Sequence, residues 1–147
     1  MSTLAPLTES EVNQLVTEWF HKLDQHAPIE EVLLMLADTG LEMRFPEGTW
    51  HNAAEVRQWY ENVTHRYFDE VHTLKELTIL PEKDLANVQL VVNWQPHIWN
   101  PPAAKSQWLG FDATQHWVVK RSPRTQQPVI ATYIVQAITP MPGSASL

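Results

Sequence analysis

The sequence predicts an α+β fold, in which three helices from the N-terminal half pack on the concave face of a curved, cone-shaped sheet of antiparallel or mixed strands. Helical spacing of apolar residues is confined to the first part of the chain, and long β-forming runs fill the rest. Helices that are segregated from consecutive strands indicate an antiparallel meander, not a doubly wound parallel sheet. The length of 147 residues suits a single domain with one core, and we expect one domain over residues 1–147.

The first helix is predicted within residues 8–27. Thr8 and Glu11 form an S/T-x-x-E capping box, and the acidic residues of the first turn favour the positive end of a helix. One apolar stripe follows at helical spacing, made of Val12, Leu15, Val16, Trp19, Phe20 and Leu23.

Two further helices are predicted around a short strand. Pro28 is suited to the first turn of a helix over residues 28–38, which Gly40 ends. Apolar and charged residues alternate within residues 41–48, which indicates a strand. Asn52 is predicted to cap a helix over residues 53–68.

Four strands are predicted after the third helix, over residues 71–80, 86–99, 106–121 and 128–138. The connectors between them are rich in turn-forming residues. The Pro/Gly/Ser-rich end of the chain predicts a flexible tail, so that the ordered core spans about residues 8–140.

The stretch 93–108 combines three tryptophans with three prolines and is interpreted as a long, bulged hairpin arm. A turn at Pro101 and Pro102 places Trp94 opposite Trp108 as a cross-strand pair. Trp99 has the other parity and is expected at the rim of a cavity or against a partner.

Composition excludes several classes of protein. The net charge of −7 gives no basic surface for nucleic acid, and the absence of cysteine excludes disulfides and a thiol nucleophile. The N-terminus lacks the features of a signal peptide, and no apolar run approaches the ~20 residues of a membrane span. We therefore expect a cytoplasmic protein that binds neither nucleic acid nor a membrane.

The order of elements, the stretch MLADTGLEMRFPEGTWHNAAEVRQWYENV and the four closing strands resemble the nuclear transport factor 2-like superfamily in its SnoaL-like branch. The resemblance covers roughly residues 8–140. It implies a small hydrophobic ligand, no cofactor and no metal. It also implies a homodimer formed through the outer face of the sheet, in agreement with the largely apolar faces of residues 128–138. The superfamily contains isomerases, cyclases, dehydratases and non-catalytic proteins, so the fold does not decide the activity.

The residues expected to carry chemistry are His72, Asp112 and His116. Ketosteroid isomerase-like members carry an aspartate in the strand after the second helix, where this chain has Met43 and Phe45 instead. The resemblance places a histidine near the cavity just after the third helix. His72 occupies that position, either as an acid–base group or as a structural histidine.

Asp112 and His116 share one face of a strand, but about 13 Å of strand separates them, so they cannot bond to each other. The alternation does not tell which face of this strand is concave. Two histidines and a carboxylate, His65, Asp69 and His72, would form the ligand set of a metal site if they lay on one face of a continuous helix. The predicted change from helix to strand before His72 breaks that face, so a metal site is disfavoured.

Three functions remain open: a binding module with an apolar aromatic cavity, a small cofactor-independent dehydratase, cyclase or isomerase, and an accessory subunit of a larger enzyme. The cavity is expected to be lined by Trp19, Phe45, Trp59, Val63, Trp94, Trp108 and Tyr133.

Overall fold

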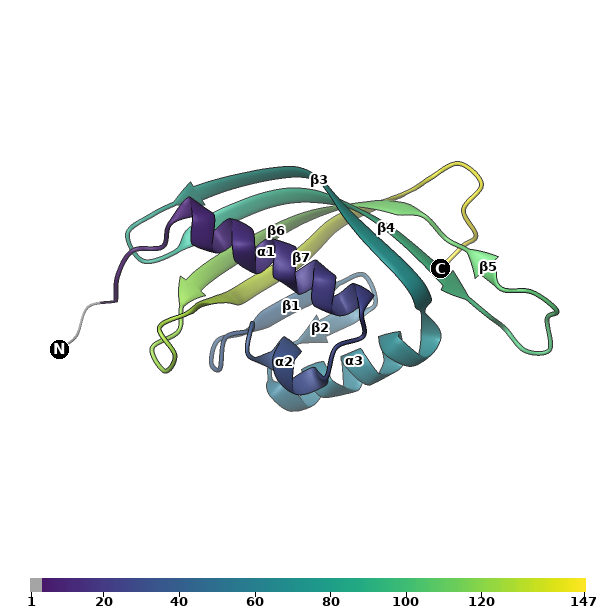
Figure 1. Cartoon of the computed structure of the whole chain (residues 1–147), viewed down its shortest axis with the longest axis horizontal. Coiled ribbons are helices and arrows are strands. Elements are labelled where there is room, and N and C mark those ends of the chain that lie inside the picture. The colour runs from purple at the N-terminus through teal and green to yellow at the C-terminus, as the bar shows by residue number, and fades with distance from the viewer. Residues whose placement is uncertain (1–3) are drawn as a thin grey trace.

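The computed structural model describes residues 4–147, which form three helices and one seven-stranded sheet (Figure 1). The helices are α1 (Glu9–Asp24), α2 (Ile29–Leu33) and α3 (Ala53–Arg66). The strands are β1 (Glu42–Phe45), β2 (Gly48–Trp50), β3 (Phe68–Pro81), β4 (Ala86–Ile98), β5 (Gln107–Trp108), β6 (Phe111–Arg121) and β7 (Pro128–Pro140). The predicted α+β class is confirmed.

The sheet is mixed, curved and unclosed. Its strand order is β2-β1-β7-β6-β4-β3, with β5 paired to β4, so β2 and β3 are its edges. β1 runs parallel to β7, and the other neighbours are antiparallel. The long strands curve over α1, while α2 and α3 lie at the side of β1 and β2 (Figure 1). Buried residues of the helices and the sheet form one main core cluster.

Helix α1 begins at the predicted capping box. The Thr8 hydroxyl accepts the Glu11 backbone N–H at 3.1 Å, and the Glu11 carboxylate accepts the Thr8 N–H at 3.2 Å. The predicted apolar stripe packs into the concave side of the sheet, with Trp19 fully buried.

Helix α2 is shorter than predicted because the chain after it pairs with the sheet. Ile130 donates its N–H to the Met35 carbonyl at 2.8 Å, and Ala37 donates to the Ile130 carbonyl at 2.9 Å. These tertiary bonds replace the helical bonds that local sequence favours. The predicted strand at 41–48 is divided in the structure into the hairpin of β1 and β2.

The hairpin arm is present, but its register differs from the prediction. Ile98 pairs with Gln107 and His97 pairs with Trp108, so Trp94 lies opposite Phe111 and not opposite Trp108. The predicted Trp94–Trp108 pair is wrong because the turn lies further along the chain than was assumed. Trp99 is exposed, and its indole donates to the Ala103 carbonyl at 2.6 Å.

The C-terminal segment, where the sequence predicts a flexible tail, lies along the arm. Ala145 donates its N–H to the Trp108 carbonyl at 3.2 Å, and Gly110 donates to the Ser144 hydroxyl at 3.0 Å. A Cβ at Gly110 would lie 2.5 Å from the Trp108 ring and 2.6 Å from the sulfur of Met141, so this close packing requires glycine.

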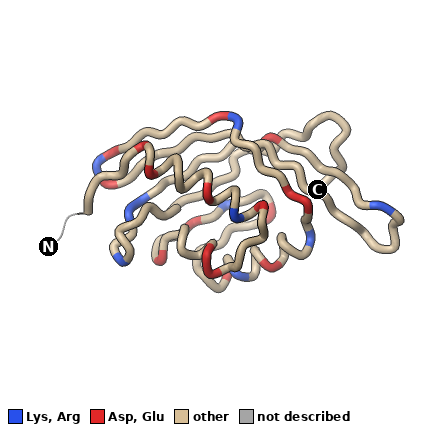
Figure 2. The backbone as a smooth tube through the Cα atoms, in the orientation of Figure 1, with Lys and Arg blue, Asp and Glu red and all other residues tan. Residues whose placement is uncertain are grey.

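Positively and negatively charged residues are interspersed along the whole fold, and neither sign gathers in one region (Figure 2). No helix within residues 4–147 is long and apolar enough to span a membrane.

Arg121, the last residue of β6, binds the N-terminal end of α1 through hydrogen bonds. Its Nη2 and Nη1 donate to Glu11 Oε1 and Oε2 at 2.8 and 3.0 Å, and it also bonds the carbonyls of Ala5 and Pro6. The hydrogen bond from Arg121 is the main cause that lowers the pKa of Glu11 to about 2.

We expect Glu11→Gln to destabilise the fold by about 1 kcal/mol at pH 7, a modest figure because solvent screens this partly exposed pair. The folded-state pKa lies below the ordinary value of 4.5, so the ionised carboxylate stabilises the fold above pH 4.5. This contribution is lost as the pH falls from 4.5 towards 2. Urea unfolding at pH 7 and pH 2.5 measures the effect, with Glu9→Gln as the control. A variant that loses as much stability on acidification as the wild type would contradict the assignment.

Candidate active site

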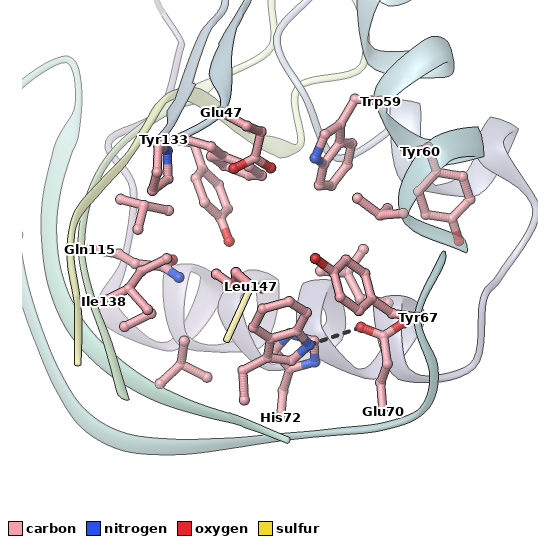
Figure 3. Close-up of a pocket in the computed structure, with 18 of the residues that line it drawn as sticks. Glu47, Trp59, Tyr60, Tyr67, Glu70, His72, Gln115, Tyr133, Ile138 and Leu147 are labelled. Atoms are coloured by element: carbon pink, nitrogen blue, oxygen red, sulfur yellow. Dashed lines mark hydrogen bonds between the residues drawn. The ribbon is translucent and has the colours of Figure 1, made fainter. Parts of the chain in front are cut away.

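A cavity of about 120 Å³ lies between the concave face of the sheet and α3 (Figure 3). An apolar cavity of roughly 150 Å³ can hold a benzene molecule, so this volume suits one small ring. Aromatic side chains supply much of the wall, namely Phe45, Trp59, Tyr60, Tyr67, Trp94 and Tyr133. Val63 and the end of the chain, Leu147, also line the cavity.

Alternation along β6 decides which of its residues reach the cavity. Ala113 and Gln115 line it, and Trp117 is fully buried on the same face. Asp112 and His116 consequently lie on the opposite, convex face.

Asp112 and His116, expected beside His72, each have partners outside the cavity. Asp112 accepts from Lys75 at 3.3 Å and from the Asn93 amide at 3.0 Å. The hydrogen bond from Asn93 is the largest cause that lowers the pKa of Asp112, and the bond from Lys75 adds to it. His116 Nε2 lies 3.1 Å from Asn87 Oδ1. The structure therefore corrects the predicted grouping, because these two side chains do not face the cavity.

His72 does line the cavity, and its partner is Asp24, the last residue of α1. Asp24 Oδ1 lies 2.5 Å from His72 Nδ1, and Asp24 Oδ2 accepts the His72 backbone N–H at 3.0 Å. The imidazole is stacked between Phe20 and Trp94, with ring centroids 5.1 and 6.2 Å away. One hydrogen bond to the ring and two stacked rings therefore hold the imidazole in one orientation, while the bond from the backbone N–H fixes Asp24 beside it.

The Asp24 contact selects the tautomer of His72. A carboxylate beside Nδ1 favours the form in which Nδ1 carries the proton, which leaves Nε2 as a hydrogen-bond acceptor. Nε2 has no hydrogen-bond partner within the described part of the chain. A histidine arranged in this way is suited to accept a proton from a bound molecule.

Besides His72 and Glu47, the cavity wall includes the titratable side chain of Glu70, which sequence reasoning missed. Its side chain is 8% exposed. Glu70 Oε1 accepts the Trp94 indole N–H at 2.9 Å, and Oε2 lies 2.5 Å from His26 Nε2. One member of each of two histidine–carboxylate pairs therefore lines the cavity, Glu70 and His72, at alternate positions of β3.

Hydrogen-bond donors face the cavity from other sides. The buried Trp59 Nε1 has no partner among residues 4–147, and its indole nitrogen points inward in Figure 3. Gln115 Oε1 accepts from Trp117 at 3.0 Å, so the amide nitrogen of Gln115 is turned towards the open space. The Tyr133 hydroxyl points there as well, and burial raises the pKa of Tyr133, so that it remains a donor. Each of these groups can donate a hydrogen bond to a polar atom of a bound ligand.

Two tryptophans expected in the cavity wall lie elsewhere, whereas the remaining predicted wall residues line it: Phe45, Trp59, Val63, Trp94 and Tyr133. Trp19 packs behind the wall against Trp117 and Tyr133, with centroids 6.3 and 5.7 Å away. Trp108 lies on the hairpin arm, where its indole donates to Gln95 at 3.2 Å.

No group of three or more histidine, aspartate or glutamate side chains that could hold a metal ion occurs within residues 4–147. In particular, His65 bonds the Glu61 carbonyl at 2.7 Å on α3, while His72 faces the cavity from β3.

The fold is that of nuclear transport factor 2-like proteins. A hexachlorocyclohexane dehydrochlorinase, LinA-type3 from Novosphingobium barchaimii, has a TM-score of 0.72 at 15% identity, over 94% of this chain and 92% of that one. A proposed dehydratase of the NTF2-like family from Streptomyces avermitilis has a TM-score of 0.73 at 14% identity, over 90% and 95% of the two chains. A protein of unknown function with a cystatin-like fold from Nostoc punctiforme scores 0.71 at 16% identity, over 99% and 100%. No protein-family model and no curated protein matches the sequence.

Tyr60 anchors the loop that carries His26. Its hydroxyl donates to the Ala27 carbonyl at 2.5 Å in a buried contact. Burial, reinforced by the charges of Glu70 and Glu31, raises the pKa of Tyr60 to about 12.

We expect Tyr60→Phe to lower the free energy of unfolding by about 1–2 kcal/mol at pH 7, since it leaves the Ala27 carbonyl without its donor. The raised pKa means that protonated Tyr60 stabilises the fold below pH 10, and that this contribution is lost as the pH rises from 10 towards 12. Denaturant unfolding at pH 7 and pH 11 measures both effects. The variant is expected to lose less stability between these pH values than the wild type, and an equal loss would refute the assignment.

Proposed function

We propose that this protein is a small cofactor-independent lyase or isomerase of the SnoaL-like type, which binds one apolar ring molecule in the cavity. His72 removes a proton from a carbon of that ring, and Asp24 orients the imidazole. The observation that carries the proposal is the 2.5 Å contact between Asp24 Oδ1 and His72 Nδ1 at the wall of a partly open aromatic cavity.

The donors in the cavity support a substrate with a carbonyl oxygen. A C–H bond beside a carbonyl is acidified because the electron pair left behind moves onto that oxygen. Trp59, Gln115 and Tyr133 each present a donor to the cavity, and a donor that bonds such an oxygen stabilises the negative charge that develops on it. His72 receives the proton on Nε2, and the resulting imidazolium is stabilised by the Asp24 carboxylate.

The solved structures with this fold support the same class of chemistry. Two of them are a dehydrochlorinase and a proposed dehydratase, and both names describe eliminations that begin or end with the loss of a proton from carbon. A binding module without chemistry would need only isolated polar groups in its cavity. Here two histidine–carboxylate pairs reach the same cavity, which favours an enzyme over a simple binder.

The proposal is tested by the exchange of the α-protons of cyclohexanone in D₂O, followed by ¹H NMR. This probe has one ring and one carbonyl, and its exchange needs proton removal alone. We expect wild type to accelerate the exchange, and His72→Gln to lower the catalysed rate by about 100-fold or more. Asp24→Asn is expected to lower it as well, because it no longer selects the tautomer.

Matched controls come from the convex face. His116→Gln and Asp112→Asn make the same two chemical changes away from the cavity, and we expect each to keep the rate within about threefold of wild type. Absence of catalysed exchange in the wild type, or equal losses in cavity and convex-face variants, would refute the proposed function.

We also propose that the protein forms a homodimer through the convex face of the sheet. This face carries the half-buried apolar side chains of Val91, Val118 and Ile134 among short polar ones. Apolar side chains in the middle of an exposed sheet face favour contact with another surface.

Light scattering is expected to give a mass close to twice the 16.9 kDa of one chain. Val118→Lys places a charge in the centre of the convex face and is expected to produce monomers that remain folded. A wild-type protein that is monomeric at micromolar concentration would disprove the dimer.

A further inference from the structure

We infer that Glu70, held by His26, is the second proton-transfer residue of the cavity, and that it donates a proton to a leaving hydroxyl group. The reaction is then loss of water from a β-hydroxy carbonyl compound. This inference rests on the proposed role of His72 as the base and adds the group that acts at the other end of the bond being broken.

Both oxygens of the Glu70 carboxylate are held, and one of them lies against an imidazole from which it can take a proton. One oxygen is held by the Trp94 indole at 2.9 Å, and the other lies 2.5 Å from His26 Nε2. The Glu70 side chain is 8% exposed, whereas that of His26 is 30% exposed. A proton from solvent can therefore reach the cavity through the imidazole and the carboxyl group in turn.

The backbone is distorted on both sides of this contact. His26 and Asp69 have φ values of +48° and +49°, a region that residues other than glycine seldom occupy. β3 also shifts register between Phe68 and Val71, so a bulge turns Glu70 towards the cavity. Residues with strained backbones persist where the surrounding structure holds them firmly, and they cluster at functional sites.

Glu70 and His72 stand at alternate positions of one strand, about 7 Å apart along it. Both side chains face the open space in Figure 3. Other titratable groups near Glu70 are the hydroxyls of Tyr67, which points into the cavity, and Tyr60, whose pKa the Glu70 charge helps to raise. The spacing suits an elimination, because the proton and the leaving group come from neighbouring carbon atoms.

The leaving group decides whether an acid is needed. When His72 takes the α-proton, the C–H electron pair forms the new double bond and the C–O bond breaks. The departing oxygen takes a proton from Glu70 and leaves as water. Glu70 regains its proton through His26, and His72 returns its own to solvent, so the net change is substrate to unsaturated ketone plus water. A chloride ion leaves without protonation and would make Glu70 unnecessary.

The test compares 3-hydroxycyclohexanone with 3-chlorocyclohexanone, which share the ring, the α-proton and the product, 2-cyclohexenone. Product formation above the uncatalysed rate is followed by chromatography. We expect Glu70→Gln to slow loss of water about 100-fold or more, while it keeps loss of chloride within about threefold of wild type. His72→Gln is expected to abolish both. A merely structural role for Glu70 would slow both reactions equally.

Further variants keep the test decisive if Glu70→Gln folds poorly. His26→Gln places an amide nitrogen near the position of His26 Nε2 and can still hydrogen-bond Glu70, but it cannot relay a proton, so we expect the same selective loss. Glu76→Gln, the same carboxylate-to-amide change at an exposed residue of β3, is the matched control. The inference is overturned by equal effects on both substrates, by no effect on either, or by a wild type that exchanges cyclohexanone protons but does not release water. Failure of the exchange itself, in contrast, refutes the proposed function.

Discussion

The packing of α1 into the curved sheet is the constraint on which the candidate site depends. Trp19 and Phe20 contact Trp117 and Tyr133, with ring centroids between 4.7 and 6.3 Å apart in this layer. These rings fill the space beneath the helix, and the fully buried Trp19 and Trp117 contribute much of the hydrophobic stabilisation there. Because the layer fixes the position and direction of α1, the last residue of the helix, Asp24, reaches His72. The cavity lies just beyond this layer.

Local features of the fold were predictable from the sequence, because they depend on neighbours along the chain. The capping box at Thr8 and the apolar stripe of α1 are read from residues three and four positions apart. The register of the hairpin arm was predicted wrongly, since it depends on how many residues the turn takes up. In β6 the alternation separated Gln115 from His116, but only the curvature of the whole sheet shows which of them lies inside.

The acid–base partners were less accessible to sequence reasoning. Asp24 lies 48 residues before His72, and His26 lies 44 residues before Glu70. At the end of a helix Asp24 has the pattern of an ordinary terminal residue, and Glu70 belongs to a polar stretch that gives no sign of burial. Only the bulge at Asp69 turns Glu70 inward, and a bulge of this kind leaves no regular pattern. His72 could be predicted as a site residue because a histidine just after the third helix is enough to indicate it.

Both histidine–carboxylate pairs join the same two short segments, residues 24–26 and 70–72. A motion that separates the end of α1 from β3 therefore breaks both pairs at once, so the two groups are present together or absent together. The His72 amide hydrogen is bonded to Asp24 Oδ2. Amide hydrogens exchange with solvent when the structure around them opens. The exchange rate of this one hydrogen accordingly reports how often the whole site comes apart.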